Sequence, residues 1–150
     1  MYKRLLVAVD GSPASNKALV AALQLARESR GQLRLFHAID DMPAFSGMDA
    51  GAGSVDLLGV LRSGGQHILV EALAIAESAG VPADTVLTED FGTRLGETVS
   101  AAAKSWNADL IVLGTHGRHG MGRLLLGSGA EQIIRMAPVA VLVVRDASDD

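Results

Sequence analysis

A glycine-rich segment is the part of the sequence best suited to hold a phosphate group. Glycine occupies positions 114, 117, 120, 122, 127 and 129, between a predicted strand and a predicted helix that begins at Ser128. Glycine turns through positive φ and has no Cβ to block a ligand, so successive N–H groups can converge on an anion. The first turn of the following helix adds unpaired N–H groups and the positive end of its dipole. Local composition leaves one alternative open, a surface loop that binds nothing.

The segment does not match the phosphate motifs of common hydrolases and dehydrogenases. Gly122 and Gly127 have the spacing of a Walker loop, but Ser128 follows directly and the lysine of that motif is absent. The dinucleotide fingerprint Gly-x-Gly-x-x-Gly belongs after the first strand, where the sequence has Asp10-Gly11-Ser12-Pro13 instead. We therefore expect binding rather than P-loop hydrolysis or redox chemistry.

Other polar residues give weaker signals. Asp10 ends the first predicted strand, where it suits either a ligand contact or a turn before a helix. His116 and His119 have no further ligands close by, so no metal site is predicted. His37 is interpreted as packed or hydrogen-bonded rather than as a catalytic base. The sequence has no nucleophile elbow around Ser128, and no catalytic residue is predicted.

Alternating strands and helices must position these residues. Short apolar runs predict strands at 5–9, 32–39, 85–88, 110–113 and 140–144, and such runs are typical of buried parallel strands. Helical periodicity predicts four helices. The first starts at Pro13 behind a Ser12 cap and stops at Gly31, and the others cover 62–80, 95–106 and 128 to about 136.

This alternation predicts an α/β fold, a three-layer doubly wound five-stranded parallel sheet with strand order 3-2-1-4-5 and four helices. Asp10 and Gly114 then end neighbouring strands where the strand order reverses, which is where such sheets bind ligands. Residues 1–150 are expected to form a single domain. Within it, 41–61 is interpreted as a mobile loop, either a lid or a loop without function, and 146–150 as a solvated tail.

Composition limits the class of protein. Hydrophobic residues make up 49% and aromatic residues 3%, so the core must come from Leu, Val, Ile and Ala. A net charge of −4 argues against nucleic acid as a partner, because phosphate backbones need a basic face. The sequence has no cysteine and no apolar run long enough to span a membrane. A cytoplasmic protein without membrane insertion is expected.

At the level of motifs, the sequence resembles the universal stress protein family. The matching pattern is Gly-x2-Gly-x9-Gly-Ser/Thr, which stands here as Gly114, Gly117, Gly127 and Ser128. Further similar stretches lie at 5–12, 37–40, 109–114 and 141–145, so that the resemblance covers nearly the whole chain.

The resemblance implies a fold and a ligand. Family members with this loop bind ATP, sometimes with Mg²⁺ or Mn²⁺, on a five-stranded parallel sheet, and commonly dimerise through their last strands, here Ala140 to Val144. Carried over position by position, the nucleotide-binding residues are Ala8, Val9, Asp10, Ala38, Leu113, Gly114, Thr115, His116, Gly117, Arg118, Gly127, Ser128, Gly129 and Ala130. Gly129 stands where Val is common, Ala130 where a second hydroxyl residue is frequent, and Ala140 where Pro is frequent.

The resemblance thus implies an ATP-binding stress-response regulator that acts through nucleotide-dependent conformation or dimer contacts. Any ATP hydrolysis or autophosphorylation is expected to be slow. Two alternatives remain, a nucleotide-independent module that regulates a transporter or enzyme, and a protein that binds AMP or a cyclic nucleotide.

Overall fold

The computed structural model describes residues 1–39, 54–89, 93–116 and 128–146, and of residues 54–56, 116 and 128 it describes the backbone. Five strands form one parallel sheet: β1 (Arg4–Ala8), β2 (Gln32–Ala38), β3 (Ala83–Thr88), β4 (Leu110–His116) and β5 (Ala140–Asp146). Their order is β3-β2-β1-β4-β5, as predicted, so the order reverses between β1 and β4.

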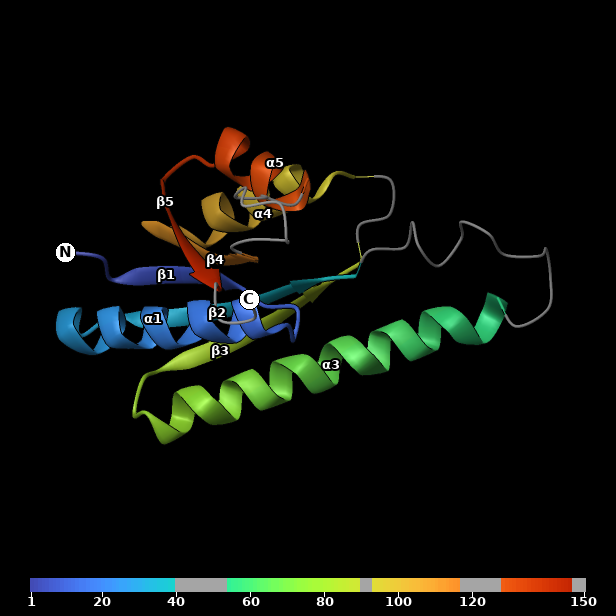
Figure 1. Ribbon diagram of the computed structural model, residues 1–150, viewed down its shortest axis with the longest axis horizontal. Helices are drawn as coiled ribbons and strands as arrows, with labels where there is room; N and C mark the ends of the chain where they lie inside the picture. The colour runs from blue at the N-terminus through green and yellow to red at the C-terminus, as the bar shows by residue number, and fades with distance from the viewer. Residues whose placement is uncertain (40–53, 90–92, 117–127, 147–150) are drawn as a thin grey trace.

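Four helices connect the described strands and cover both faces of the sheet (Figure 1). They are α1 (Pro13–Ser29), α3 (Ser54–Ser78), α4 (Leu95–Trp106) and α5 (Ser128–Met136). Helices α1 and α3 pack on one face and α4 and α5 on the other. The predicted three-layer α/β class is therefore confirmed.

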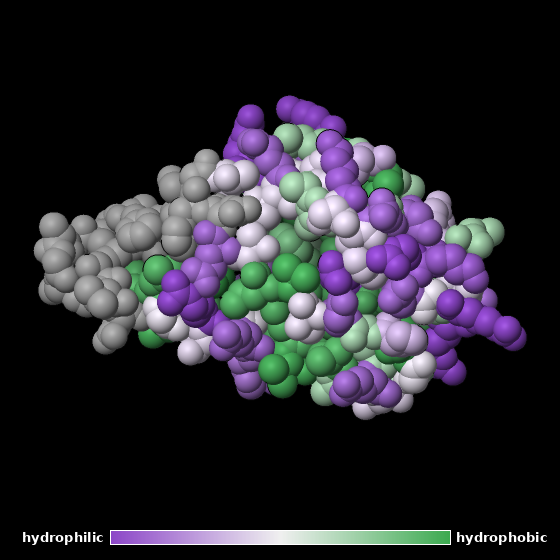
Figure 2. Space-filling model, turned by 180° about the vertical axis from the view of Figure 1, so that it is seen from behind, coloured by the Kyte–Doolittle hydropathy of each residue, from purple (hydrophilic) through white to green (hydrophobic). Residues whose placement is uncertain are grey.

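Strand β1 shows why the sequence gives two cores. Leu5, Val7 and Val9 point into the core beneath α1 and α3, whereas Leu6 and Ala8 contact the core beneath α4 and α5. Successive strand residues point to opposite faces, so a continuous apolar run serves both layers. Seen from behind, hydrophobic residues also reach the surface in patches near the middle of the molecule, with hydrophilic residues between them (Figure 2).

Several predicted boundaries were wrong, among them those of the 41–61 loop, of the tail and of the first helix. Helix α3 begins at Ser54, so 54–61 are helical rather than part of a loop, while 41–53 lie outside the described residues. Asp146 is the last residue of β5 and is 3% exposed, so it does not belong to a solvated tail, and 147–150 are not described. The stop of α1 is Arg30, whose φ of 57° makes it the left-handed cap, and Gly31 follows it.

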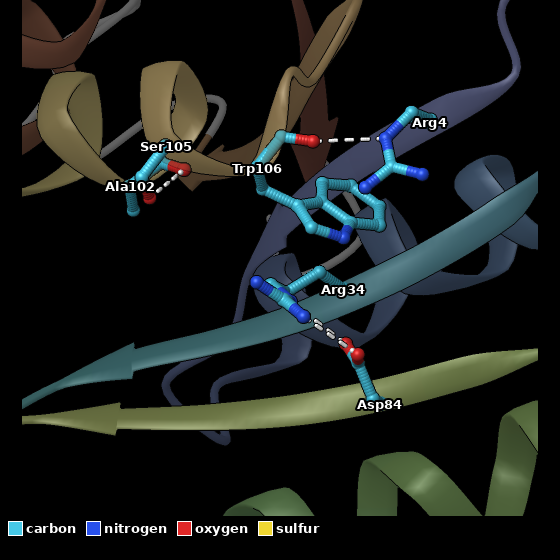
Figure 3. A network of polar contacts seen from close by, with 6 residues as sticks. All are labelled: Arg4, Arg34, Asp84, Ala102, Ser105 and Trp106. Atoms are coloured by element: carbon cyan, nitrogen blue, oxygen red, sulfur yellow. Dashed lines mark hydrogen bonds and ion pairs between the residues drawn. The ribbon is translucent and has the colours of Figure 1, made fainter.

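The amino end of the sheet carries a network of charged and aromatic side chains (Figure 3). The guanidinium carbons of Arg4 and Arg34 lie 4.3 Å and 4.9 Å from the centroid of the Trp106 ring. Arg4 Nε donates to the Trp106 carbonyl (2.8 Å), and Arg34 forms two hydrogen bonds with the carboxylate of Asp84 (2.8 and 2.9 Å). These contacts tie β1, β2, β3 and the end of α4 together.

Within the described parts of the chain, no helix is both long and apolar enough to cross a membrane.

Candidate functional site

The carboxyl end of β1 leads into a tight hydrogen-bonded turn. The Asp10 N–H donates to Ser15 Oγ (3.0 Å), and Asp10 Oδ1 accepts from the Ser12 N–H (2.9 Å). Ser12 caps α1, because its Oγ accepts from the Ser15 N–H (3.1 Å), and Gly11 takes a φ of 82°. Asp10 therefore has the turn role that the sequence predicted as one of two alternatives. Its exposed side chain also borders the cavity described below.

The end of β4 lies directly against the first turn of α1. A Cβ on Gly114 would overlap the carbonyl oxygen of Ala14, so glycine is required for this approach. Gly114 lies inside β4, which runs to His116 instead of ending at Leu113, because Gly114 and Thr115 pair with Val144 and Arg145 of β5. The first glycine of the motif is therefore required for packing, at the point where the strand order reverses.

His37 fixes the end of β2 against β1. Its Nδ1 lies 2.7 Å from the Val9 carbonyl oxygen. A carbonyl only accepts, so Nδ1 carries the hydrogen and donates. The prediction of a hydrogen-bonded histidine is confirmed, although the half-buried ring also borders the cavity.

A cavity of about 270 Å³ opens at this end of the sheet. Its walls come from the ends of β1, β2 and β4 and from the starts of α1, α4 and α5. Predicted site residues form much of the lining: Ala8, Val9, Asp10, Ala38, Leu113, Gly114, Thr115, Gly129 and Ala130. The structure thus brings together residues that lie up to about 120 positions apart in the sequence, as expected at the carboxyl edge of a doubly wound sheet.

Other predicted site residues are described in part or not at all. His116 ends β4 and Ser128 begins α5, and only their backbones are placed. Gly117, Arg118 and Gly127 lie outside the described residues. Both ends of the glycine-rich segment nevertheless leave from elements that border the cavity.

The sequence prediction missed several residues that line the cavity, namely Ser12, Ala14, Ser15, Phe36, His37, Leu95 and Ile133. The pair Ser12-x-x-Ser15 could have been found, because a cap at Ser12 places position 15 in the first turn, facing the strand end. Phe36 and Ile133 read as core residues, and both are buried in the α4–α5 core. Leu95 gave no signal, since nothing in the sequence shows which face the first residue of α4 presents.

Two ion pairs join helices to the carboxyl ends of β5 and β3, and none of their residues lines the cavity. Lys17 Nζ lies 3.1 Å from Oδ1 of the buried Asp146, which joins α1 to the end of β5. Arg62 of α3 hydrogen-bonds Glu89 just after β3, and this contact holds the pKa of Glu89 below its usual value. Among the described residues, no group of three or more His, Asp or Glu side chains is placed to hold a metal ion.

Comparison with known proteins identifies close relatives of this architecture. Residues 1–145 match the model of the universal stress protein family. A universal stress protein of Methanocaldococcus jannaschii is 38% identical over 97% of this chain and 83% of its own. A solved structure from Burkholderia pseudomallei, described as a universal stress protein family member, is 31% identical, has a TM-score of 0.73 and covers 95% of this chain and 96% of its own.

Three more distant solved structures are described with a nucleotide. They are a universal stress protein with cAMP (24% identity, TM-score 0.63, 96% and 97% covered), one from Archaeoglobus fulgidus with dAMP (21%, 0.66, 95% and 98%) and one from Arabidopsis thaliana with AMP (16%, 0.70, 98% and 94%). At these identities they share the fold with this chain, and the nucleotides are properties of those proteins.

Proposed function

This chain belongs to the universal stress protein family, and we propose that it binds one adenine nucleotide in the cavity at the carboxyl end of its sheet. The cavity carries the proposal. It lies where strand order reverses, and the first turn of α5 borders it through Gly129 and Ala130. Relatives of the same fold are described with AMP, dAMP and cAMP, which supports an adenine nucleotide as the ligand class.

The lining suits a nucleoside with a phosphate. Phe36, Leu113 and Ile133 supply apolar surface for a base, while Asp10 and Thr115 supply polar groups. Unpaired N–H groups at the start of α5 would face phosphate oxygens, aided by the helix dipole. The glycine-rich segment joins β4 to α5, two elements that border the cavity, which supports phosphate binding on this side. ATP, with Mg²⁺ or Mn²⁺, is the ligand we favour, because the chain keeps the four-residue motif Gly114, Gly117, Gly127 and Ser128.

We assign binding rather than turnover to this site. The glycine-rich segment lacks the lysine that a Walker loop uses in hydrolysis. The observed hydrogen bonds give two polar cavity residues structural roles, since Asp10 Oδ1 accepts from Ser12 and His37 Nδ1 donates to Val9. Residues 1–150 would then act as one cytoplasmic nucleotide-binding domain in a stress response, and the bound nucleotide would alter its conformation or its contacts.

Mass spectrometry of small molecules released from the purified protein tests the ligand. We expect an adenine nucleotide at up to one per chain, and its mass separates ATP from AMP and cyclic AMP. Incubation with excess ATP should leave it unhydrolysed over many minutes; rapid multiple turnover would instead indicate a phosphoryl-transfer enzyme. Protein that carries no nucleotide and takes none up would favour a nucleotide-independent module.

A second proposal concerns β5, which is an edge strand of the sheet. Its residues 141–144 are Val, Leu, Val and Val, and all four are half-buried. An exposed apolar edge is a template for pairing with another strand. We propose that Ala140 to Val144 pair with a second copy to form a homodimer. Sedimentation velocity over a range of concentrations should show a dimer, and a monomer throughout would contradict this.

A further inference from the structure

Leu95 has a large apolar side chain that packs in neither of the two cores. It is 37% exposed and belongs to neither core cluster. Among the large hydrophobic side chains described as exposed, it is the one that borders the carboxyl-end cavity. A ligand that covers a partly exposed leucine at a cavity mouth binds more tightly, because the apolar surface of the leucine is then removed from water.

Close packing at two glycines sets the position of Leu95. At Gly96, a Cβ would stand 2.7 Å from the Cβ of Gln132, and the Gly96 N–H donates to Gln132 Oε1 (3.1 Å). These contacts fix the first turn of α4 against α5. At Gly129, a Cβ would stand 2.8 Å from Cδ2 of Leu95. The Leu95 side chain therefore lies over the start of α5 in space that a larger residue at 129 would take.

The chemistry of the cavity decides which part of a nucleotide Leu95 would touch. Its hydrocarbon side chain offers no hydrogen bond to a phosphate, and it joins Leu113 and Ile133 in the apolar part of the lining. Asp10, Ser12 and Ser15 supply polar groups from the turn before α1 and from its first turns. A flat base or the face of a ribose is the ligand surface that matches an apolar side chain.

We propose that Leu95 is a specificity-determining residue of the nucleotide site, which closes its apolar wall over the nucleoside, and that Gly129 makes room for it. This rests on the proposed function and adds α4 to the site. The absence of a side chain at Gly129 then has a function, because it leaves the space in which Leu95 of α4 makes the apolar contact.

Titration calorimetry of Leu95→Ala with AMP and with inorganic tripolyphosphate tests the proposal. We expect AMP to bind about tenfold more weakly, which corresponds to the loss of the exposed part of one leucine contact. Tripolyphosphate, which has no nucleoside, should bind as it does to the unaltered protein. Leu95→Met keeps an apolar side chain of similar volume and should restore most of the affinity for AMP.

Ile134→Ala is the matched control. Ile134 is 42% exposed, lies on α5 and does not border the cavity, so its loss should leave AMP binding unchanged. Thermal unfolding without ligand should show Leu95→Ala and Ile134→Ala both folded. Equal AMP affinity in Leu95→Ala and the unaltered protein would overturn the inference and leave the proposed function standing. An equal loss for AMP and tripolyphosphate would overturn it too, whereas no AMP binding by the unaltered protein would remove the proposed function itself.

A double-mutant cycle separates contact from general damage. Gly129→Ala should weaken AMP binding in the unaltered background, because its Cβ displaces Leu95. In the Leu95→Ala background the same change meets no side chain and should cost clearly less. Equal losses in both backgrounds would show that Gly129 and Leu95 act independently, against the proposal.

Discussion

The two ends of the sheet use their side chains in opposite ways. At the amino end, Arg4 and Arg34 both contact Trp106, and Arg34 also binds Asp84, so that these polar groups hold strands and helix together. At the carboxyl end, Ala8, Ala38 and Gly114 are small and leave a cavity of about 270 Å³. One end of the same strands stabilises the fold, and the other keeps space for a ligand. Substitutions at the two ends should therefore have separable effects on stability and on binding.

Gly114→Ala should have the largest effect on folding. Its Cβ would overlap the backbone carbonyl of Ala14, which cannot move without shifting α1. We expect a loss of about 4 kcal/mol or more in the free energy of unfolding, or no folded protein, in chemical denaturation. Gly64→Ala, where a Cβ meets nothing within 4 Å in the exposed part of α3, is the control and should be neutral or stabilising by up to about 1 kcal/mol. A Gly114→Ala protein as stable as the unaltered one would show that α1 and β4 do not approach closely.

Trp106→Ala should break the amino end while sparing the site. Trp106 is 7% exposed and packs in the α4–α5 core between two guanidinium groups. Its removal should cost about 3 kcal/mol in urea unfolding. Nucleotide affinity, measured at a temperature where the variant is folded, should stay within about twofold. A large loss of affinity in the folded variant would mean that the two ends are coupled.

Lys17→Met should have a smaller effect at the carboxyl end. It removes the 3.1 Å ion-pair partner of Asp146, whose carboxylate is buried, and a buried charge is destabilised when an opposite charge beside it is removed. Because Lys17 is half exposed, we expect a loss of about 1–2 kcal/mol in the free energy of unfolding. The double variant Lys17→Met with Asp146→Asn should recover part of that loss, and a purely additive result would argue against the pair.

Asp84→Asn should give the smallest effect and a characteristic pH dependence. The hydrogen bonds from Arg34 hold the pKa of Asp84 below its usual value. The stability from this pair is thus present above the unfolded-state pKa and is lost as the pH falls through the lower, folded-state pKa. Since both side chains are partly exposed, we expect less than about 1 kcal/mol at pH 7. The difference from the unaltered protein should vanish in strong acid, and an unchanged difference at pH 2 would contradict this.

Sequence patterns predicted the fold better than the edges of its elements. Apolar runs and their order were enough for the sheet, because β1 must serve two cores at once. They did not show that β4 continues to His116, since that extension depends on pairing with β5. They also missed the start of α3 at Ser54, because the glycines at 53 and 59 favoured a loop.

Part of the cavity lining was predicted, where strand ends and turn residues specify it. Asp10 and Gly114 follow from strand order and both border the cavity. Leu95 and Ile133 could not be predicted, because their places depend on how α4 packs against α5. The closeness of Gly96 to Gln132 and of Gly129 to Leu95 is a property of two helices far apart in the sequence.

Titration of nucleotide-stripped protein with ATP and with AMP in the presence of magnesium tests the central claim most directly. We predict saturable heat with one site per chain for at least one of the two nucleotides. Ala38→Leu, which fills space in the cavity lining, should abolish that heat while the protein stays folded by circular dichroism. Absence of heat from the unaltered protein at high micromolar nucleotide, or undiminished heat from Ala38→Leu, would contradict the assignment of this cavity as the nucleotide site.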